Sequence, residues 1–319
     1  MKEYSNFQYL IENYSVGLQD DMSTSIHSIN GDSLSLSSTE KTLYLLWNHI
    51  SNKLPTDKLL STNFTLEKEK FNNFWNKIKG TPSPSRAMGD MFWMNLPWGD
   101  IKKNLGEVNI LDIGCGAGGY CKKLQNWSNS IITSYKGLDI HQSPKWHDNI
   151  NWGKEEGINV SFEQTDLDSD TTFDIPANIN FLMSQSAVEH IKNDLGIFKQ
   201  LKKFMYQKDE PCMQLHLFPG PASLDLYLLH GYRQYGDFAI NKIVDLFSDC
   251  DVELYKICGE ASNKLHFDYI TKPIYLDNLG DKRDSNPEQY RELLHAALLT
   301  DLQKEIENPA FWALKIYKG

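Results

Sequence analysis

Apolar and polar positions recur along residues 108–317 with two periods, one typical of strands and one typical of helices. The apolar runs predict strands at 108–113, 135–140, 158–165, 179–184, 211–218, 251–258 and 311–317. Helical spacing predicts helices near 118–127, 143–156, 188–206, 238–248 and 287–306. Such alternation is typical of a parallel sheet with helices on both faces. We therefore predict an α/β fold for this part of the chain.

The region before the first predicted strand carries helical patterns. Residues 39–53 and 66–79 each place their large apolar side chains on one face. Residues 20–38 are rich in Ser, Thr, Asp and Asn, which is typical of a loop. We predict an N-terminal helical cap or lid over residues 1–105, followed by a second domain over residues 106–319.

Net charge, cysteine content and the length of apolar stretches indicate which partners and which cellular compartment to expect. The chain has 42 acidic and 32 basic residues, a formal charge of −10. Affinity for phosphate backbones comes from Lys and Arg, so nucleic acid is disfavoured as a partner. The five cysteines form no C-x-x-C pair, which favours free thiols in a reducing cytoplasm. No apolar stretch approaches the ~20 residues of a membrane span. We expect a cytoplasmic protein with no membrane contact.

The predicted strand at 108–113 runs into a glycine-dense turn. Glycine lacks a Cβ, so such a turn lets a nucleotide-like ligand approach the backbone closely. Gly114, Gly116 and Gly119 satisfy the G-x-G-x-x-G pattern of dinucleotide-binding proteins. This match alone leaves open whether the ligand is a dinucleotide or another nucleotide-like molecule.

The segment from Val108 to Tyr120, with Asp112 just before the first glycine, resembles motif I of the class I S-adenosylmethionine-dependent methyltransferases. The resemblance implies a seven-stranded Rossmann-like sheet whose last strand is antiparallel to its neighbours. It also implies S-adenosylmethionine as the cofactor, with Asp112 near its amino-acid end. Free N–H groups at the start of the following helix favour the carboxylate of such a ligand.

Two further carboxylates follow the next strands. Asp139 ends the second strand, where it can accept hydrogen bonds from both ribose hydroxyls. Asp166 follows the third strand and resembles the family residue that accepts from the adenine amino group, while Leu167 would supply a backbone N–H. The resemblance assigns cofactor binding to Asp112, Gly114, Gly116, Gly118, Asp139, Ile140, Asp166, Leu167 and Ser184.

A Glu-His pair follows the fourth strand. The segment from Ile179 to Ile191 resembles the strand-four motif of small-molecule methyltransferases, including the ubiquinone O-methyltransferases. This end of a parallel strand lies at the edge where ligands bind. We predict Glu189 and His190 as catalytic residues, with His190 taking the proton that a hydroxyl acceptor loses. The alternative is that His190 only caps or packs the helix start.

A divalent metal is a second hypothesis for the same pair. Small-RNA terminal ribose methyltransferases and some ubiquinone methyltransferases carry E-x-x-E-H and a downstream His around such an ion. Here Ser186 stands at the position of the first Glu, which disfavours a metal. Glu189, His190 and either His216 or His230 would still form a plausible set of ligands.

Two stretches supply candidate contacts to the acceptor. Residues 86–98 either cover the site as a lid or attach the cap to the core. Residues 226–236 loosely resemble the region after strand five in methyltransferases encoded near bacterial surface-glycan genes. We predict acceptor contacts by Arg86, His230, Tyr232 and Arg233. The implied substrate is a small polar molecule, such as a sugar, nucleotide sugar or phosphorylated precursor of polysaccharide biosynthesis, methylated on oxygen.

Three alternatives stay open at this point. An RNA ribose 2'-O-methyltransferase would use the same cofactor, although the acidic charge disfavours it. A nicotinamide-dependent oxidoreductase would use the same glycine turn. A noncatalytic protein would bind S-adenosylmethionine and turn nothing over. The oligomeric state is not specified by any of these patterns.

Overall fold

Eight strands form one sheet in the computed structural model, which describes residues 21–57, 59–168 and 173–319. The strands are β1 (Thr62–Asn63), β2 (Val108–Ile113), β3 (Ile132–Asp139), β4 (Asn159–Gln164), β5 (Phe181–Gln185), β6 (Cys212–Pro219), β7 (Asp251–Ile257) and β8 (Phe311–Lys318). Their order across the sheet is β1-β7-β8-β6-β5-β2-β3-β4. The strands from β2 to β6 pair in parallel, and β8 lies antiparallel between β6 and β7.

The predicted parallel sheet with an antiparallel last strand is therefore confirmed. The expected number of strands was seven, and β1 adds an eighth at the edge by pairing with β7. A strand of two residues has no readable period, so periodicity could not predict it.

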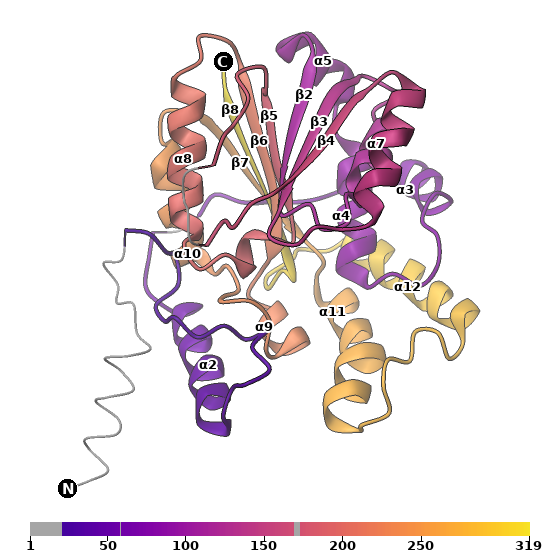
Figure 1. The fold of residues 1–319 in the computed structure, drawn as a ribbon. Coiled ribbons are helices and arrows are strands. Elements are labelled where there is room, and N and C mark those ends of the chain that lie inside the picture. Colours follow the sequence, from indigo (N-terminus) through magenta and orange to yellow (C-terminus); the bar gives the residue numbers. More distant parts are fainter. Residues whose placement is uncertain (1–20, 58, 169–172) are drawn as a thin grey trace, which may run out of the picture.

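Helices cover both faces of this sheet (Figure 1). The α-helices are α2 (Ser38–Ser51), α3 (Lys68–Trp75), α4 (Pro84–Asn95), α5 (Trp98–Leu105), α6 (Gly119–Trp127), α7 (Lys145–Glu156), α8 (Asp194–Tyr206), α9 (Ser223–Tyr227), α10 (Asp237–Val244), α11 (Glu260–His266) and α12 (Pro287–Asp301). The described residues also form two short 3-10 helices, η1 (Val188–His190) and η2 (Asp245–Phe247), and one π-helix, η3 (Phe267–Leu276). Within the described residues, no helix combines the length and apolar composition needed to cross a bilayer.

Two hydrophobic clusters lie on opposite faces of the sheet, because successive side chains of a strand point to opposite faces. In β2, Ile110 joins the cluster that contains residues of α3, α4, α6 and α12. Leu111 joins the cluster that contains residues of α8 and α10. Figure 1 shows α8 and α10 on one side of the sheet and α4 and α7 on the other. A doubly covered sheet of this kind presents the ends of its strands as the place for a ligand.

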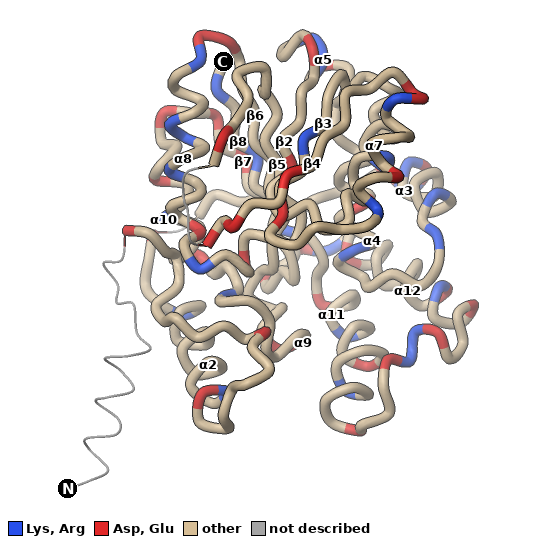
Figure 2. Tube along the Cα trace, in the orientation of Figure 1, with Lys and Arg blue, Asp and Glu red and all other residues tan. Residues whose placement is uncertain are grey.

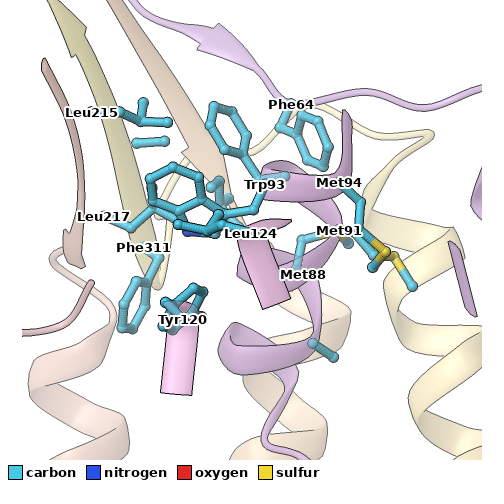
Figure 3. Packing of buried hydrophobic residues seen from close by; sticks show 14 of the residues in the cluster. Phe64, Met88, Met91, Trp93, Met94, Tyr120, Leu124, Leu215, Leu217 and Phe311 are labelled. Atoms are coloured by element: carbon cyan, nitrogen blue, oxygen red, sulfur yellow. The ribbon is translucent and has the colours of Figure 1, made fainter. Parts of the chain in front are cut away.

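Helix α4 is buried along nearly its whole length, with Arg86 as the exposed exception. Trp93 lies among Leu215, Leu217 and Phe311 in Figure 3. Its indole N–H donates a hydrogen bond of 2.8 Å to the side-chain oxygen of Gln185 in β5. Packing against the core, rather than a lid, accounts for this aromatic stretch.

The N-terminal region attaches to the sheet in two ways. Residues 62–105 supply β1 and three helices that share the cluster of α4. Helix α2 instead meets α9 through a small cluster of Ile29, Leu43, Tyr44 and Leu224. The domain boundary at residue 105 stays a prediction, and residues 1–20 of the predicted cap lie outside the described residues.

Charged residues of both signs are interspersed over the helices and loops (Figure 2). Within the described residues, the acidic and basic side chains are therefore not separated into blocks of one sign.

Arg233 and Asp194 form a buried ion pair. Their side chains are 2% and 0% exposed, and the closest nitrogen and oxygen lie 3.2 Å apart. The Asp194 carboxylate also accepts hydrogen bonds from the backbone and hydroxyl of Thr24, at 2.9 and 2.5 Å, and from the hydroxyl of Tyr235 at 2.9 Å. One carboxylate thus joins the N-terminal segment to the segment that follows α9.

The same guanidinium interrupts a predicted helix. It donates hydrogen bonds to the carbonyls of Ile191 and Lys192, at 2.6 and 2.9 Å. These carbonyls lie between η1 and α8, so the helix predicted over 188–206 divides into two elements there.

Replacing Arg233 by Met should lower the free energy of unfolding by about 3–5 kcal/mol, because Asp194 would stay buried without its cation. Urea denaturation measures this change. Lys264→Met is the control, because it removes an exposed pair with Asp268 and should cost less than about 1 kcal/mol. Equal small losses in both variants would contradict a stabilising role for the buried pair.

Candidate active site

The loop between β2 and α6 bends through three glycines with positive φ. These angles are +71° at Gly114, +54° at Gly116 and +73° at Gly118. A Cβ on Gly114 would lie 2.4 Å from that of Ala187, and a Cβ on Gly118 would lie 2.6 Å from the ring of Phe162. A Cβ on Gly116 would meet no described atom within 4 Å. The bend therefore needs glycine for its conformation, and it leaves open space beside Gly116.

Asp139 is held against this bend by backbone groups. One carboxylate oxygen accepts from the N–H of Gly116 at 2.7 Å, and the other accepts from the N–H of His141 at 3.0 Å. A carboxylate oxygen has a second lone pair, so both can still accept a hydrogen bond from a ligand hydroxyl.

A cavity of about 400 Å³ lies at this edge of the sheet. It is lined by Gly114, Gly116, Asp139, Ile140, His141, Leu167, Asp168, Ser186, Ala187, His190 and Ile191. Ile140 is 45% exposed, which is unusual for so apolar a side chain and gives the cavity an apolar wall. The structure thus brings together six of the residues predicted to act at the site, namely Gly114, Gly116, Asp139, Ile140, Leu167 and His190.

Two predicted cofactor residues lie inside the protein instead. Asp112 is 2% exposed and accepts a hydrogen bond from the hydroxyl of Tyr135. Burial raises the pKa of Asp112 to about 7, despite that hydrogen bond. Ser184 is fully buried, and its hydroxyl lies 2.8 Å from Nδ1 of His216. Because side chains alternate along β5, Ser184 points to the face opposite Gln185.

Asp166 and Gly118 shape the site without lining it. Asp166 accepts a hydrogen bond of 3.0 Å from the backbone N–H of Asp168, and Asp168 does line the cavity. Burial raises the pKa of Asp168, although the N–H of Lys192 donates to its carboxylate.

A second, smaller cavity of about 160 Å³ shares Ser186 with the first. It is lined by Ser83, Ser85, Arg86, Gln185, Ser186, Tyr227, His230 and Phe311. Arg86 donates a hydrogen bond of 3.1 Å to the hydroxyl of Tyr120. Two of the four predicted acceptor contacts, Arg86 and His230, therefore lie together here.

The other two predicted acceptor contacts, Tyr232 and Arg233, form hydrogen bonds with backbone carbonyls instead. Tyr232 donates its N–H to the carbonyl of Glu189 at 2.8 Å, and Arg233 is the buried partner of Asp194. Neither lines the two described cavities.

Carboxylates and imidazoles meet where the two cavities adjoin. Glu189, His190 and His230 each bring one ligand atom within 4.8 Å of the others. Asp32 lies 2.7 Å from Nδ1 of His190. His216, the other histidine considered for this cluster, lies in the core, where burial lowers its pKa to about 3.

Asp32 and His190 shift each other's pKa in opposite directions. Burial lowers the pKa of His190, but the hydrogen bond to Asp32 and the charges of Glu189 and Asp32 outweigh it, so the pKa is raised. Burial raises the pKa of Asp32, but the hydrogen bonds from His190 and Gly231 outweigh it, so the pKa is lowered. The pair favours an imidazolium beside a carboxylate.

Sequence reasoning missed Asp32, Ser186 and Asp168. Asp32 lies in a polar loop and meets His190 across 158 positions, so no local pattern could have revealed it. Ser186 was noted only as a departure from a metal motif. Its φ of +51° and its place between two cavities mark it as a site residue.

No protein-family model and no curated protein matches the chain. A solved structure described as a sarcosine dimethylglycine methyltransferase, from Galdieria sulphuraria, shares 12% identity over 79% of this chain and 99% of that one, with a TM-score of 0.44. Coclaurine N-methyltransferase bound to N-methylheliamine and SAH shares 14% over 87% and 93%, with a TM-score of 0.42. The plantazolicin methyltransferase BpumL, in complex with a monoazolic desmethylPZN analog and SAH, shares 14% over 79% and 90%, with a TM-score of 0.40. At these identities and scores the likeness carries no argument about what this chain binds.

Replacing Asp112 by Asn should change how stability depends on pH. The pKa of this carboxyl is about 7 in the folded protein and close to 3.8 when unfolded. The folded state therefore binds the proton more tightly, and the stability gained below about pH 4 is lost as the pH rises to about 7. Relative to the Asn variant, the free energy of unfolding of the natural protein should fall over that range and then level off. Urea denaturation at stepped pH checks this, and a constant difference would contradict it.

Proposed function

We propose that this chain is an S-adenosylmethionine-dependent methyltransferase that acts on a small polar acceptor. The cavity at the glycine bend carries the proposal. Asp139 faces it with lone pairs suited to ribose hydroxyls, and Ile140 and Leu167 offer apolar surface to a base. Gly116 leaves the backbone open to close approach. These residues fit an adenosine-containing ligand.

The arrangement of strands favours this cofactor over a nicotinamide dinucleotide. In dinucleotide-binding sheets the strand order is 3-2-1-4-5-6, so the last two strands lie next to each other. The strands that correspond to these two here are β6 and β7. Here the antiparallel β8 separates β6 from β7. A cavity of about 400 Å³ also suits one nucleoside with a short chain better than two nucleosides.

S-adenosylmethionine, when bound, supplies a methyl group on a sulfonium that is a good leaving group. The protein then has to align an acceptor oxygen with that methyl group and remove the proton of the acceptor. His190 lines the larger cavity, and Ser186 lines both, so an acceptor in the smaller cavity reaches toward His190. His190 is the group that acts on its hydroxyl, and the buried Glu189 lies 3.8 Å from Nε2 of His190, so its negative charge supports a protonated imidazole.

The smaller cavity indicates the class of acceptor. Arg86 lines it, and a guanidinium has five N–H donors that suit a phosphate or carboxylate. A hydroxylated sugar phosphate, nucleotide sugar or related precursor of a polysaccharide combines both features, and O-methylation is the proposed reaction. The proposed location is the cytoplasm, which fits the five free cysteines. The net charge of −10 disfavours an RNA acceptor.

Asp139→Ala should weaken the binding of S-adenosylmethionine by about 1–3 kcal/mol, because ribose hydroxyls would lose their acceptor. Calorimetry with S-adenosylmethionine, its demethylated product and NAD measures this. Asp148→Ala, an exposed change on α7, is the matched control and should leave affinity unchanged. Saturation with NAD alone would overturn the proposed function.

His190→Gln should leave the affinity for S-adenosylmethionine nearly intact and lower turnover by about 10²–10⁴-fold. Turnover is followed as release of demethylated cofactor over a panel of sugar phosphates and nucleotide sugars. His147→Gln, on the exposed side of α7, is the control. Equal turnover in both variants would remove His190 from the reaction.

A further inference from the structure

Glu189 is a buried carboxylate that lacks a hydrogen-bond donor. Its side chain is 0% exposed. Among the residues that the structure describes, none donates to either carboxylate oxygen. Burying a charge without a partner is costly, and buried carboxylates are normally paired or bound to a cation. Both carboxylate oxygens of Glu189 therefore lack a hydrogen-bond donor, and the closest groups that can carry positive charge are the imidazoles of His190 and His230.

Two imidazoles face this carboxylate. Nε2 of His190 and Nε2 of His230 each lie 3.8 Å from Oε1 of Glu189. Two ligands bound at ~2.1 Å to one zinc-sized cation lie at most about 4.2 Å apart, a limit that each Glu–His pair satisfies. The three ligand atoms all lie within 4.8 Å of one another, so a small shift of the imidazoles would bring all three around one ion. The two rings meet edge to face, with centroids 4.6 Å apart.

Asp32 faces the Nδ1 atoms of both rings and is hydrogen-bonded to that of His190. Its two oxygens lie 2.7 Å from Nδ1 of His190 and 3.7 Å from Nδ1 of His230. The carboxylate is itself fixed by the N–H of Gly231 at 3.0 Å. Metal-binding histidines commonly donate their second N–H to such a carboxylate, which aims the free nitrogen at the ion.

We propose that Glu189, His190 and His230 bind one divalent transition-metal cation, and that Asp32 is the positioning residue for His190. Two imidazoles and one carboxylate suit Mn²⁺, Fe²⁺, Co²⁺ or Zn²⁺ better than Mg²⁺ or Ca²⁺, which prefer oxygen ligands throughout. Ser186 carries a hydroxyl where the E-x-x-E-H pattern has a carboxylate, so this set has three protein ligands.

The position of the three ligands between the two cavities gives the cation a role in activating the acceptor. This role rests on the proposed function. His190 lines the larger cavity and His230 lines the smaller one. A cation between them keeps coordination positions open to an acceptor oxygen. It would lower the pKa of the acceptor hydroxyl, so that its proton passes to solvent water and the oxygen then forms its bond to the methyl group as the carbon–sulfur bond breaks; His190 would then act as a ligand of the cation and not as the base.

Metal binding can be measured without cofactor or acceptor. The full chain is stripped with a chelator and titrated with Co²⁺, followed by visible absorption and calorimetry. We expect one site per chain and bands of a histidine-bound ion. His230→Gln should weaken binding at least 100-fold, and Asp32→Asn should weaken it about 10–100-fold while the bands remain. His147→Gln is the control and should bind like the natural protein.

Two results would overturn the site: no saturable Co²⁺ binding by the natural protein, or equal binding by the His230 and His147 variants. Thermal unfolding of each variant confirms that it is folded, and Glu189→Gln adds a second ligand change. If Co²⁺ fails to bind while S-adenosylmethionine binds, the metal site is wrong and the proposed function stands. If Co²⁺ binds and S-adenosylmethionine does not, the proposed function is wrong and the metal site stands.

Discussion

The buried ion pair of Arg233 and Asp194 holds together the segments on which the proposed acceptor side of the site depends. Asp194 binds Thr24 of the N-terminal segment, and Arg233 binds carbonyls just after η1. Glu189 and His190 belong to η1, and His230 lies three residues before Arg233. A charge pair in the interior is costly unless its geometry and its additional hydrogen bonds are good. Here those bonds fix the three chain segments that meet at the two cavities.

The cofactor side of the site depends on a different constraint, the positive φ angles of the glycine bend. Local sequence determines this part, because strand, turn and helix are contiguous. The predicted strand at 108–113 coincides with β2, and the predicted helix at 118–127 differs from α6 by one residue. The carboxylate Asp139 was predictable for the same reason, since it ends the adjacent parallel strand.

The acceptor side could be predicted only in part. A polar loop composition gave no sign that Asp32 would contact two histidines. Arg233 has the chemistry of an anion ligand, yet burial makes it the partner of Asp194. Ser184 directly precedes Gln185, which lines the smaller cavity. Successive side chains of β5 point to opposite faces, so the side chain of Ser184 points into the core. In each case a long-range contact or the side of a strand decided the outcome, and neither can be inferred from residue type.

The long separation between Asp32 and its partners has a consequence for the order of assembly. Asp32 meets His190 across 158 positions, and Thr24 meets Asp194 across 170. Closing such loops costs chain entropy that only the finished contacts offset. The contacts of Thr24 and Asp32 therefore cannot form before Asp194 and Gly231 have been synthesised. The residues that line the larger cavity are all encoded by position 191, whereas the smaller cavity is complete only when Phe311, near the end of the chain, is in place.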